Sequence, residues 1–249
     1  MLTEPLVQQL TQLRLHGMAQ ALKQQIASPD RTQLSLIQHE ITERASFRLA
    51  QRLRWARLPL PACLEDLDTR TPRGLDRGEL HRLTELSWIR EHLNVLITGP
   101  CGVGKSFLAC ALCHTACRAD FSVRCFRVPR LLEELARYKA MQRRSAFYRQ
   151  LAKADLLLID DFGLAPLPDD AVRDLLEILE DRYDRRSTVV TSQLPMDQWH
   201  AYLGDRTVAD AILDRLVHNS YRIVLKGESM RKQRGIALKP AAPSRSKDH

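Results

Sequence analysis

Residues 99–106 constrain the fold of this chain more than any other stretch, because they read Gly-Pro-Cys-Gly-Val-Gly-Lys-Ser. Two glycines separated by four residues and followed by Lys105 and Ser106 match the phosphate-loop pattern. An apolar stretch typical of a buried strand precedes the loop, and an apolar helical stretch follows it. A plain glycine turn is the alternative interpretation, and this strand and helix context disfavours it.

The residue types of this loop suit phosphate binding. Glycines allow backbone N–H groups to surround a phosphate at the N-terminus of the following helix. Lys105 is predicted to reach the terminal phosphates, and the Ser106 hydroxyl to coordinate Mg²⁺. The predicted nucleotide-binding residues are Gly99, Pro100, Cys101, Gly102, Val103, Gly104, Lys105, Ser106 and Phe107.

A second apolar run ends in two acids and supplies the other half of such a site. Four apolar residues at 156–159 precede Asp160 and Asp161. Asp160 is the candidate Mg²⁺ ligand at the end of a buried strand, and Asp161 is the candidate general base that polarises the attacking water. Two acids that merely end a strand are the alternative. Together the loop and the acids predict a complete core for nucleotide hydrolysis with bound Mg²⁺.

Short apolar runs alternate with amphipathic stretches from residue 93 onward. This alternation predicts an α/β fold of the P-loop nucleotide hydrolase type, with a parallel five-stranded sheet and helices on both faces. Ser192 or Gln193, at the end of the fourth strand, is a candidate sensor of the terminal phosphate or an ordinary loop residue. The predicted strands are 93–98, 122–128, 155–160, 188–192 and 221–225, and the predicted helices lie near 105–119, 130–152, 169–184 and 206–218.

Composition divides the rest of the chain. Leucine and isoleucine recur at helical spacing on either side of a break at Ser28-Pro29-Asp30, whereas prolines and glycines interrupt the residues before the core. The predicted domains are a helical N-terminal domain at 1–57, a linker and start of the core at 58–92, an ATPase core at 93–232, and a disordered basic tail at 233–249.

Hydrophobic residues make up 44% and charged residues 27% of the 249 residues, which is typical of a globular protein. No apolar run approaches the roughly 18 residues of a membrane span, and the N-terminus lacks the basic-then-apolar pattern of a signal peptide. We therefore expect a cytoplasmic protein without membrane partners. Six cysteines are too few for a secreted disulfide scaffold, so reduced thiols are expected.

Three of the cysteines, Cys110, Cys113 and Cys117, share one face of the helix after the phosphate loop. A zinc site needs ligands from separate converging elements, so we interpret them as buried core thiols. Cys101, inside the loop, is expected to be exposed enough for alkylation where nucleotide does not cover it.

The net charge of +8 is concentrated locally and favours a polyanionic partner. Residues 118–149 hold nine basic and three acidic side chains, whereas residues 150–225 are acidic overall. Five arginines without an acid lie between 44 and 57, where they suit a nucleic-acid backbone or form a solvated face. The candidate DNA-binding residues are Arg44, Arg48, Arg52, Arg54 and Arg57, followed in the second block by Arg137, Lys139, Arg143 and Arg144.

Phe147 and Tyr138 accompany the second basic block as core or base-stacking residues, and we expect at least one of them in the core.

Arg215 lies near the C-terminal end of an amphipathic stretch at 205–216. ATPases gain rate from an arginine placed against the developing charge, often from a neighbouring subunit. A solvated or helix-dipole arginine is the alternative.

The chain resembles the IstB-like proteins, the ATP-binding helpers encoded beside the transposase of a family of bacterial insertion sequences. This group is related to the DnaC helicase loaders and to the DnaA initiator among the AAA+ ATPases. The resemblance extends from Leu2 to about Lys232. Besides the phosphate loop, its markers are Leu13-Arg-Leu-His-Gly-Met18, Leu64-Glu-Asp-Leu-Asp68, Leu158-Ile-Asp-Asp-Phe-Gly163, Thr191-Ser-Gln193, Ala209-Asp-Ala-Ile-Leu-Asp-Arg-Leu216 and Leu225-Lys-Gly-Glu-Ser-Met-Arg231.

The resemblance implies an AAA+ core with an absent or minimal C-terminal lid, and a homo-oligomer whose interfaces are bridged by ATP on duplex DNA. It also implies recruitment or stimulation of a cognate transposase at the target site. By motif, Lys105, Ser106 and Asp160 hold phosphate and metal, Ser192 lies near the first sensor position, and Arg215 matches the trans-acting arginine finger.

Two departures from the family pattern stand out. Asp161 occupies the place of the usual catalytic Glu and is one methylene shorter, so hydrolysis is expected to be slow or to use a further water. Arg231 is only a weak match to a second sensor arginine. The alternatives left open are a DnaC-like helicase loader, a small-molecule kinase, and a DNA-packaging protein that binds ATP without turnover.

Overall fold

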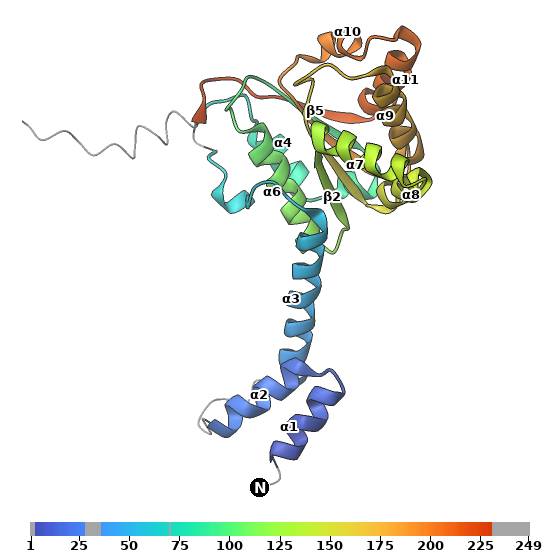
Figure 1. The fold of residues 1–249 in the computed structure, drawn as a ribbon. Coiled ribbons are helices and arrows are strands. Elements are labelled where there is room, and N and C mark those ends of the chain that lie inside the picture. Colours follow the sequence, from blue (N-terminus) through green and yellow to red (C-terminus); the bar gives the residue numbers. More distant parts are fainter. Residues whose placement is uncertain (1–2, 28–35, 70, 231–249) are drawn as a thin grey trace, which may run out of the picture. The chain divides into compact units, whose positions relative to one another are not determined.

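A computed structural model describes residues 3–27, 36–69 and 71–230 of the 249. The predicted tail at 233–249 and the candidate second sensor Arg231 lie outside the described residues. The chain divides into two compact units, Met1–Trp55 and Ala56–His249. Figure 1 shows the helices of the first unit and the sheet of the second.

The first unit is helical. The pattern predicted over 2–26 forms two helices, α1 (Thr3–Gln12) and α2 (His16–Ala27), because the chain turns at Arg14, which has a φ of 58°. The third helix is α3 (Leu36–Ala56). Gly17 begins α2 against α3, since a Cβ there would lie 2.8 Å from the Cα of Glu40. The Glu40 carboxylate accepts a hydrogen bond from the main-chain N–H of Met18 at 3.1 Å, which satisfies a free donor of the first turn of α2.

The second unit contains the predicted parallel five-stranded sheet, in the order β2-β3-β4-β1-β5. All five strands follow apolar runs of the sequence, and four of them are almost wholly buried. The strands are β1 (Asn94–Thr98), β2 (Val123–Arg127), β3 (Leu156–Phe162), β4 (Ser187–Ser192) and β5 (Ser220–Val224).

Helices cover both faces of the sheet, as predicted (Figure 1). The helix after the phosphate loop, α6, packs on one face, whereas α7, α8, α9 and α11 lie on the other. Successive strand residues point to opposite faces, so Leu96 packs among the α7–α11 helices while its neighbours Val95 and Ile97 face α6. These helices are α6 (Lys105–Arg118), α7 (Val128–Ala140), α8 (Arg144–Lys153), α9 (Asp169–Arg182), α10 (Trp199–Leu203) and α11 (Arg206–Val217).

The single helix predicted near 130–152 is wrong, because the structure has two helices there. The chain turns between α7 and α8 at Gln142, whose φ is 54°. No glycine or proline marks this turn, so the sequence carried no local signal for it. Phe147 of α8 is buried, as expected for at least one of the two aromatic residues, and Tyr138 of α7 stacks on it with ring centroids 4.8 Å apart.

Short elements precede the sheet within the stretch predicted as linker and start of the core. They are a 3₁₀ turn, η1 (Leu64–Asp66), and the helices α4 (Arg77–Thr84) and α5 (Ser87–Arg90); a second turn, η2 (Met196–Gln198), follows β4. Asp76 caps α4 by accepting a hydrogen bond from Glu79 N at 2.9 Å. The chain between η1 and α4 passes over the phosphate loop, where it contributes to the site described next.

Candidate nucleotide-binding site

The phosphate loop joins the carboxyl end of β1 to the N-terminus of α6. Gly104 is the residue that caps α6, and its φ of 99° is strained for any residue with a Cβ. The first turn of α6 directs its N–H groups toward the loop, which is the arrangement that binds anions at helix N-termini.

Lys105 is buried at the start of α6. Its Nζ donates a hydrogen bond to the carbonyl oxygen of Pro100, within the same loop, at 2.7 Å. Burial lowers the pKa of Lys105, and the nearby Cys101, Asp161 and Asp160 oppose that effect. A desolvated cation on the loop gains a counter-charge when a phosphate binds.

The metal-binding candidates Ser106 and Asp160 are in contact. The Ser106 Oγ donates to Asp160 Oδ1 at 2.8 Å, and the hydroxyl of Thr191 donates to the same oxygen at 2.5 Å. Asp160 is only 3% exposed. A hydroxyl and a carboxylate at a phosphate site form the oxygen donor set that Mg²⁺ prefers, so these residues fit the metal. When bound, the ion would supply charge neutralisation between the phosphates and Asp160.

Asp161 lies at an irregularity in β3. The register between β3 and β4 shifts between Ile159 and Phe162, and Asp161 has a φ of 61°. Its main-chain N–H donates to Thr191 Oγ1 at 3.1 Å. Its carboxylate makes an ion pair with Arg127, at 2.6 Å from Nη2 and 2.8 Å from Nε. The candidate base is therefore near the phosphate loop but engaged by an arginine from the end of β2.

The two candidates for the sensor position lie differently. Ser192 is fully buried, and its Oγ donates to the Phe162 carbonyl at 2.6 Å and accepts from Leu194 N at 3.0 Å. Both functions of that hydroxyl serve the strand end, and the contact of Ser192 with the loop is made by its main-chain oxygen, which accepts from Gly99 N at 3.2 Å. Gln193 lines the nucleotide cavity.

One cavity of about 370 Å³ opens over the loop and is large enough for part of a nucleotide. Its lining joins the loop to apolar residues of the chain before the sheet and to Met230 near the end of the described chain. The lining residues are Leu60, Pro61, Asp66, Leu67, Asp68, Arg73, Cys101, Gly102, Gly104, Lys105, Ser106, Phe107, Asp161, Gln193 and Met230.

Arg215 lies at the opposite end of the sheet from the loop. Asn94, which begins β1, donates from Nδ2 to the main-chain oxygen of Arg215 at 2.9 Å, whereas the loop follows the last residue of β1. The guanidinium makes an ion pair with Glu180 of α9 and lies 5.9 Å from the ring centre of Tyr183. Arg215 therefore cannot reach the nucleotide site of its own chain.

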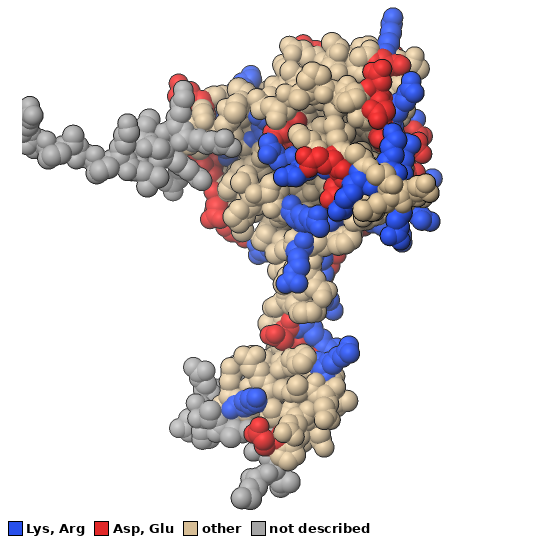
Figure 2. All heavy atoms as spheres, in the orientation of Figure 1, with Lys and Arg blue, Asp and Glu red and all other residues tan. Residues whose placement is uncertain are grey.

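The basic residues of the second block are largely paired. Arg137 bonds to Glu134, Lys139 to Asp170 at 3.4 Å, and Arg144 to Asp174 at 2.7 Å. Figure 2 shows acidic and basic side chains interleaved on the face over α7 and α8. Arg143 is exposed between the two helices. The excess charge of this block is thus partly neutralised within the fold.

The arginines at 44–57 lie along and just after α3. Arg44 donates from Nε to Glu40 at 2.6 Å, Arg48 and Arg54 are exposed, and Arg52 is half-buried. Arg57 belongs to the second unit, where it lines a cavity of about 350 Å³ beside β2 together with Arg127 and Arg130.

The cysteines are free thiols in the structure, and Cys101 is exposed while Cys110, Cys113 and Cys117 are buried, as predicted. Burial raises the pKa of Cys110 to about 12 and that of Cys113 well above its usual value. Within the described residues, no group of three or more His, Cys, Asp or Glu side chains converges as the ligands of a metal site would. None of the described helices combines the length and apolar character that a bilayer crossing requires.

The fold and the site define a P-loop nucleotide-binding protein built on a parallel five-stranded sheet. Residues 8–237 match the family model of the IstB-like ATP binding proteins, and the chain belongs to that family. The resemblance seen in the sequence is therefore confirmed.

Relatives of similar length support this assignment. An insertion-sequence ATP-binding protein of Sinorhizobium fredii is 49% identical over 239 residues, covering 93% of this chain and 98% of the relative. The ATP-binding protein of insertion sequence IS1162 from Pseudomonas fluorescens is 45% identical over 203 residues, covering 78% of this chain and 88% of the relative.

Solved structures share the core fold. DnaI matches with a TM-score of 0.56 and 24% identity, covering 67% of this chain and 92% of the DnaI chain. The DnaC helicase loader matches with a TM-score of 0.52 and 20% identity, covering 64% and 95% of the two chains. At these identities the comparison establishes the fold alone.

Three residues of the site escaped sequence reasoning. Thr191 contacts both acids, Arg127 pairs with Asp161, and Arg73 lies against the loop. Thr191 was visible only as part of a polar strand end. Arg127 is the last residue but one of the second predicted strand, where it was one of nine basic residues in its block. Arg73 lay in a segment interpreted as linker and start of the core.

Proposed function

We propose that this protein is a Mg²⁺-dependent ATPase that assembles on duplex DNA and recruits or stimulates a transposase at its target site. The observation that carries the proposal is the separation of the two halves of the catalytic machinery. The loop and the acids lie at the carboxyl edge of the sheet, and Arg215 lies at the amino edge. A site built this way is completed when a second subunit brings its arginine to the nucleotide.

Each residue then has a distinct task. Lys105 and the N–H groups of the loop bind the phosphates, Ser106 and Asp160 hold the metal, and Asp161 orients the attacking water. Asp161 is paired with Arg127, so full activity requires that this ion pair loosen. Arg215 of a neighbouring subunit stabilises charge on the transferred phosphoryl group.

Mixing two inactive variants tests completion of the site between subunits. Lys105→Ala removes nucleotide binding but keeps the arginine, whereas Arg215→Ala keeps the binding site and lacks the arginine. We expect each variant alone to lose about 10³-fold or more in turnover, and mixtures to regain activity. An Arg215→Ala protein that hydrolyses ATP at the wild-type rate would remove Arg215 from this role.

The proposal for DNA and transposase rests on charge and on relatives. The chain carries a net charge of +8, and several relatives are named as ATP-binding proteins of insertion sequences. The arginines of α3 and the arginine-lined cavity beside β2 are the candidate backbone contacts. ATP would favour the assembled, DNA-bound state, and hydrolysis would release it. Such a protein is expected to work in the cytoplasm.

Turnover measured with and without duplex DNA, at low and moderate salt, tests the link to DNA. Stimulation by DNA that weakens with salt and disappears in Lys105→Ala supports the proposal. If the rate of ATP hydrolysis does not change when DNA is added, the basic surfaces contact protein partners or are simply solvated. Stoichiometric retention of the replicative helicase in a pull-down, without retention of the transposase, would favour a helicase loader instead.

A further inference from the structure

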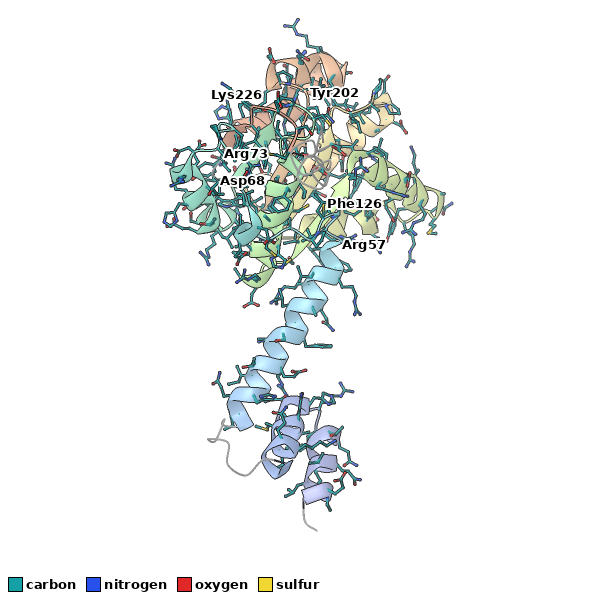
Figure 3. The ribbon with its side chains drawn as sticks, turned by 90° about the vertical axis from the view of Figure 1, so that its left-hand side faces the viewer. Arg57, Asp68, Arg73, Phe126, Tyr202 and Lys226 are labelled. Carbon is teal, nitrogen blue, oxygen red and sulfur yellow. The ribbon has the colours of Figure 1, made fainter. Side chains whose placement is uncertain are left out.

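Arg73 is a buried cation beside the phosphate loop. It lies in the chain between η1 and α4 and is 6% exposed. Its Nη1 donates to the carbonyl oxygen of Val103, inside the loop, at 3.2 Å, and its Nη2 donates to the main-chain oxygen of Asp68 at 2.7 Å. Figure 3 shows Arg73 next to Asp68 in the second unit.

The third donor of this guanidinium is idle. The Nε of Arg73 is buried and has no hydrogen-bond acceptor among the described residues. The Asp68 carboxylate accepts from Thr71 N at 3.2 Å and from Thr71 Oγ1 at 2.5 Å, so it is already engaged. Burial lowers the pKa of Arg73, and attraction to Asp68 opposes this in part. A buried charged donor without an acceptor is costly, and native structures seldom keep one without a reason.

The position of Arg73 indicates what would complete it. A Cβ placed on Gly104 would lie 2.7 Å from Arg73 Nη1, so the guanidinium lies against the residue that caps α6. Arg73 also lines the same cavity as Lys105 and Ser106. An anion seated at the N-terminus of α6 is therefore the nearest ligand that could supply a counter-charge to this guanidinium.

We propose that Arg73 is a second cation of the nucleotide site and that its guanidinium, which lies against the phosphate loop through Nη1, donates to a phosphate oxygen of the bound nucleotide. The proposal rests on the nucleotide binding proposed above. Arg73 also holds the carbonyl of Val103, so the same side chain positions the loop and contacts the ligand. A phosphate supplies a hydrogen-bond acceptor and a negative charge for the Arg73 guanidinium.

Arg182 provides a matched control. It is 1% exposed and lies at the amino end of the sheet, away from the loop. All its donor nitrogens are satisfied, by the carbonyls of Leu151 at 2.6 Å, Ala154 at 2.9 Å and Ser187, and by the Thr188 hydroxyl at 3.2 Å. Arg73 and Arg182 are thus both buried, Arg182 more deeply, and they differ in whether the protein alone satisfies their donor nitrogens.

The experiment compares Arg73→Met and Arg182→Met by thermal unfolding without nucleotide and by titration with fluorescent ATP and ADP. For Arg73→Met we expect ATP and ADP to bind about 10- to 100-fold more weakly, the loss of one charge-assisted hydrogen bond. Its unfolding midpoint should stay within roughly 2 °C of wild type, because removing an underpaired buried charge offsets the lost bonds. Arg182→Met should unfold roughly 6–20 °C earlier with unchanged nucleotide affinity in the folded protein.

Two results would overturn the proposal. One is Arg73→Met protein that binds ATP and ADP as tightly as wild type. The other is weaker binding accompanied by the early unfolding expected of Arg182→Met, which would make Arg73 a structural residue only. The salt dependence of ATP binding provides a further check, since losing a cation at the phosphates should flatten it. Failure of wild type to bind ATP, or equal binding by Lys105→Ala, would instead refute the nucleotide site itself.

Discussion

Thr191 links the two acids of the site, and its replacement by valine tests how they are held. The Thr191 hydroxyl donates to Asp160 Oδ1 at 2.5 Å and accepts from the main-chain N–H of Asp161 at 3.1 Å. Thr191 is fully buried. Valine keeps the shape and the β-branched character of the strand residue but removes both hydrogen bonds.

The expected cost follows from these two bonds. A bond to a charged carboxylate contributes about 1.5–3 kcal/mol, and an unsatisfied N–H costs about 1–3 kcal/mol where water cannot reach it. The total destabilisation is smaller than the sum of these two costs. The Ser106 hydroxyl still bonds to Asp160, and Asp161 is partly exposed, so water can reach its main chain in part. We expect a loss of about 2–4 kcal/mol in unfolding free energy. We also expect the Mg²⁺ concentration at half-maximal turnover to rise about 10- to 100-fold, because Asp160 loses an orienting partner.

The assay is ATP binding and turnover as a function of Mg²⁺ concentration, with chemical denaturation beside it. Ser192→Ala is the matched control, because that buried hydroxyl also makes two bonds but touches neither acid. The control should lose stability and keep the wild-type Mg²⁺ dependence. If Thr191→Val keeps the wild-type Mg²⁺ midpoint, Thr191 does not orient Asp160. If Ser192→Ala shifts the midpoint equally, the effect is not specific to the hydroxyl that contacts the acids.

Three further predictions concern the loop and its surroundings. Arg127→Ala frees the Asp161 carboxylate, so we expect turnover at saturating Mg²⁺-ATP to rise several-fold; a fall, measured by phosphate release, would make the ion pair part of the active arrangement. Cys101 should be the fast-reacting thiol in native protein and should be protected by ATP, whereas burial raises the pKa of Cys110 to about 12 and keeps it inert; mass spectrometry after iodoacetamide decides this. Burial lowers the pKa of Lys105, and phosphates bind its charged form, so ATP affinity should weaken with rising pH before an ordinary lysine would titrate. An ATP affinity that stays unchanged up to pH 10.5 would contradict this.

The parts of the site that sequence analysis predicts are those with a local signature. The phosphate loop needs particular residues at fixed spacing. Asp160 follows four consecutive apolar residues, which predict a buried strand. Both signals are complete within eight residues of chain. The Arg215 assignment rested on resemblance, and the structure adds that this residue is remote from the loop of its own chain.

The division of α7 from α8 shows where local signals end. Gln142 adopts a left-handed conformation, which a glycine or asparagine at this position would have predicted. The helical periodicity of the sequence continues across it. The turn is closed by a main-chain bond from Arg143 N to the Tyr138 carbonyl at 2.8 Å, and Tyr138 stacks on the buried Phe147 of the next helix. Tertiary contacts here outweigh the residue preference that sequence analysis uses.

Thr191 demonstrates the same limit at the site itself. Strand β4 lies between β1 and β3 in the sheet, so its last residues are the ones placed beside both the loop strand and the strand that ends in the acids. Which of them faces Asp160 depends on the register and on the irregularity in β3 around Asp161. Thr191 and Ser192 are adjacent and chemically alike, so only the strand order and the pleat decide that the first serves the acids and the second serves the strand end. Arg127 follows the same rule, because it reaches the site from the end of β2, whose other residues do not line the nucleotide cavity.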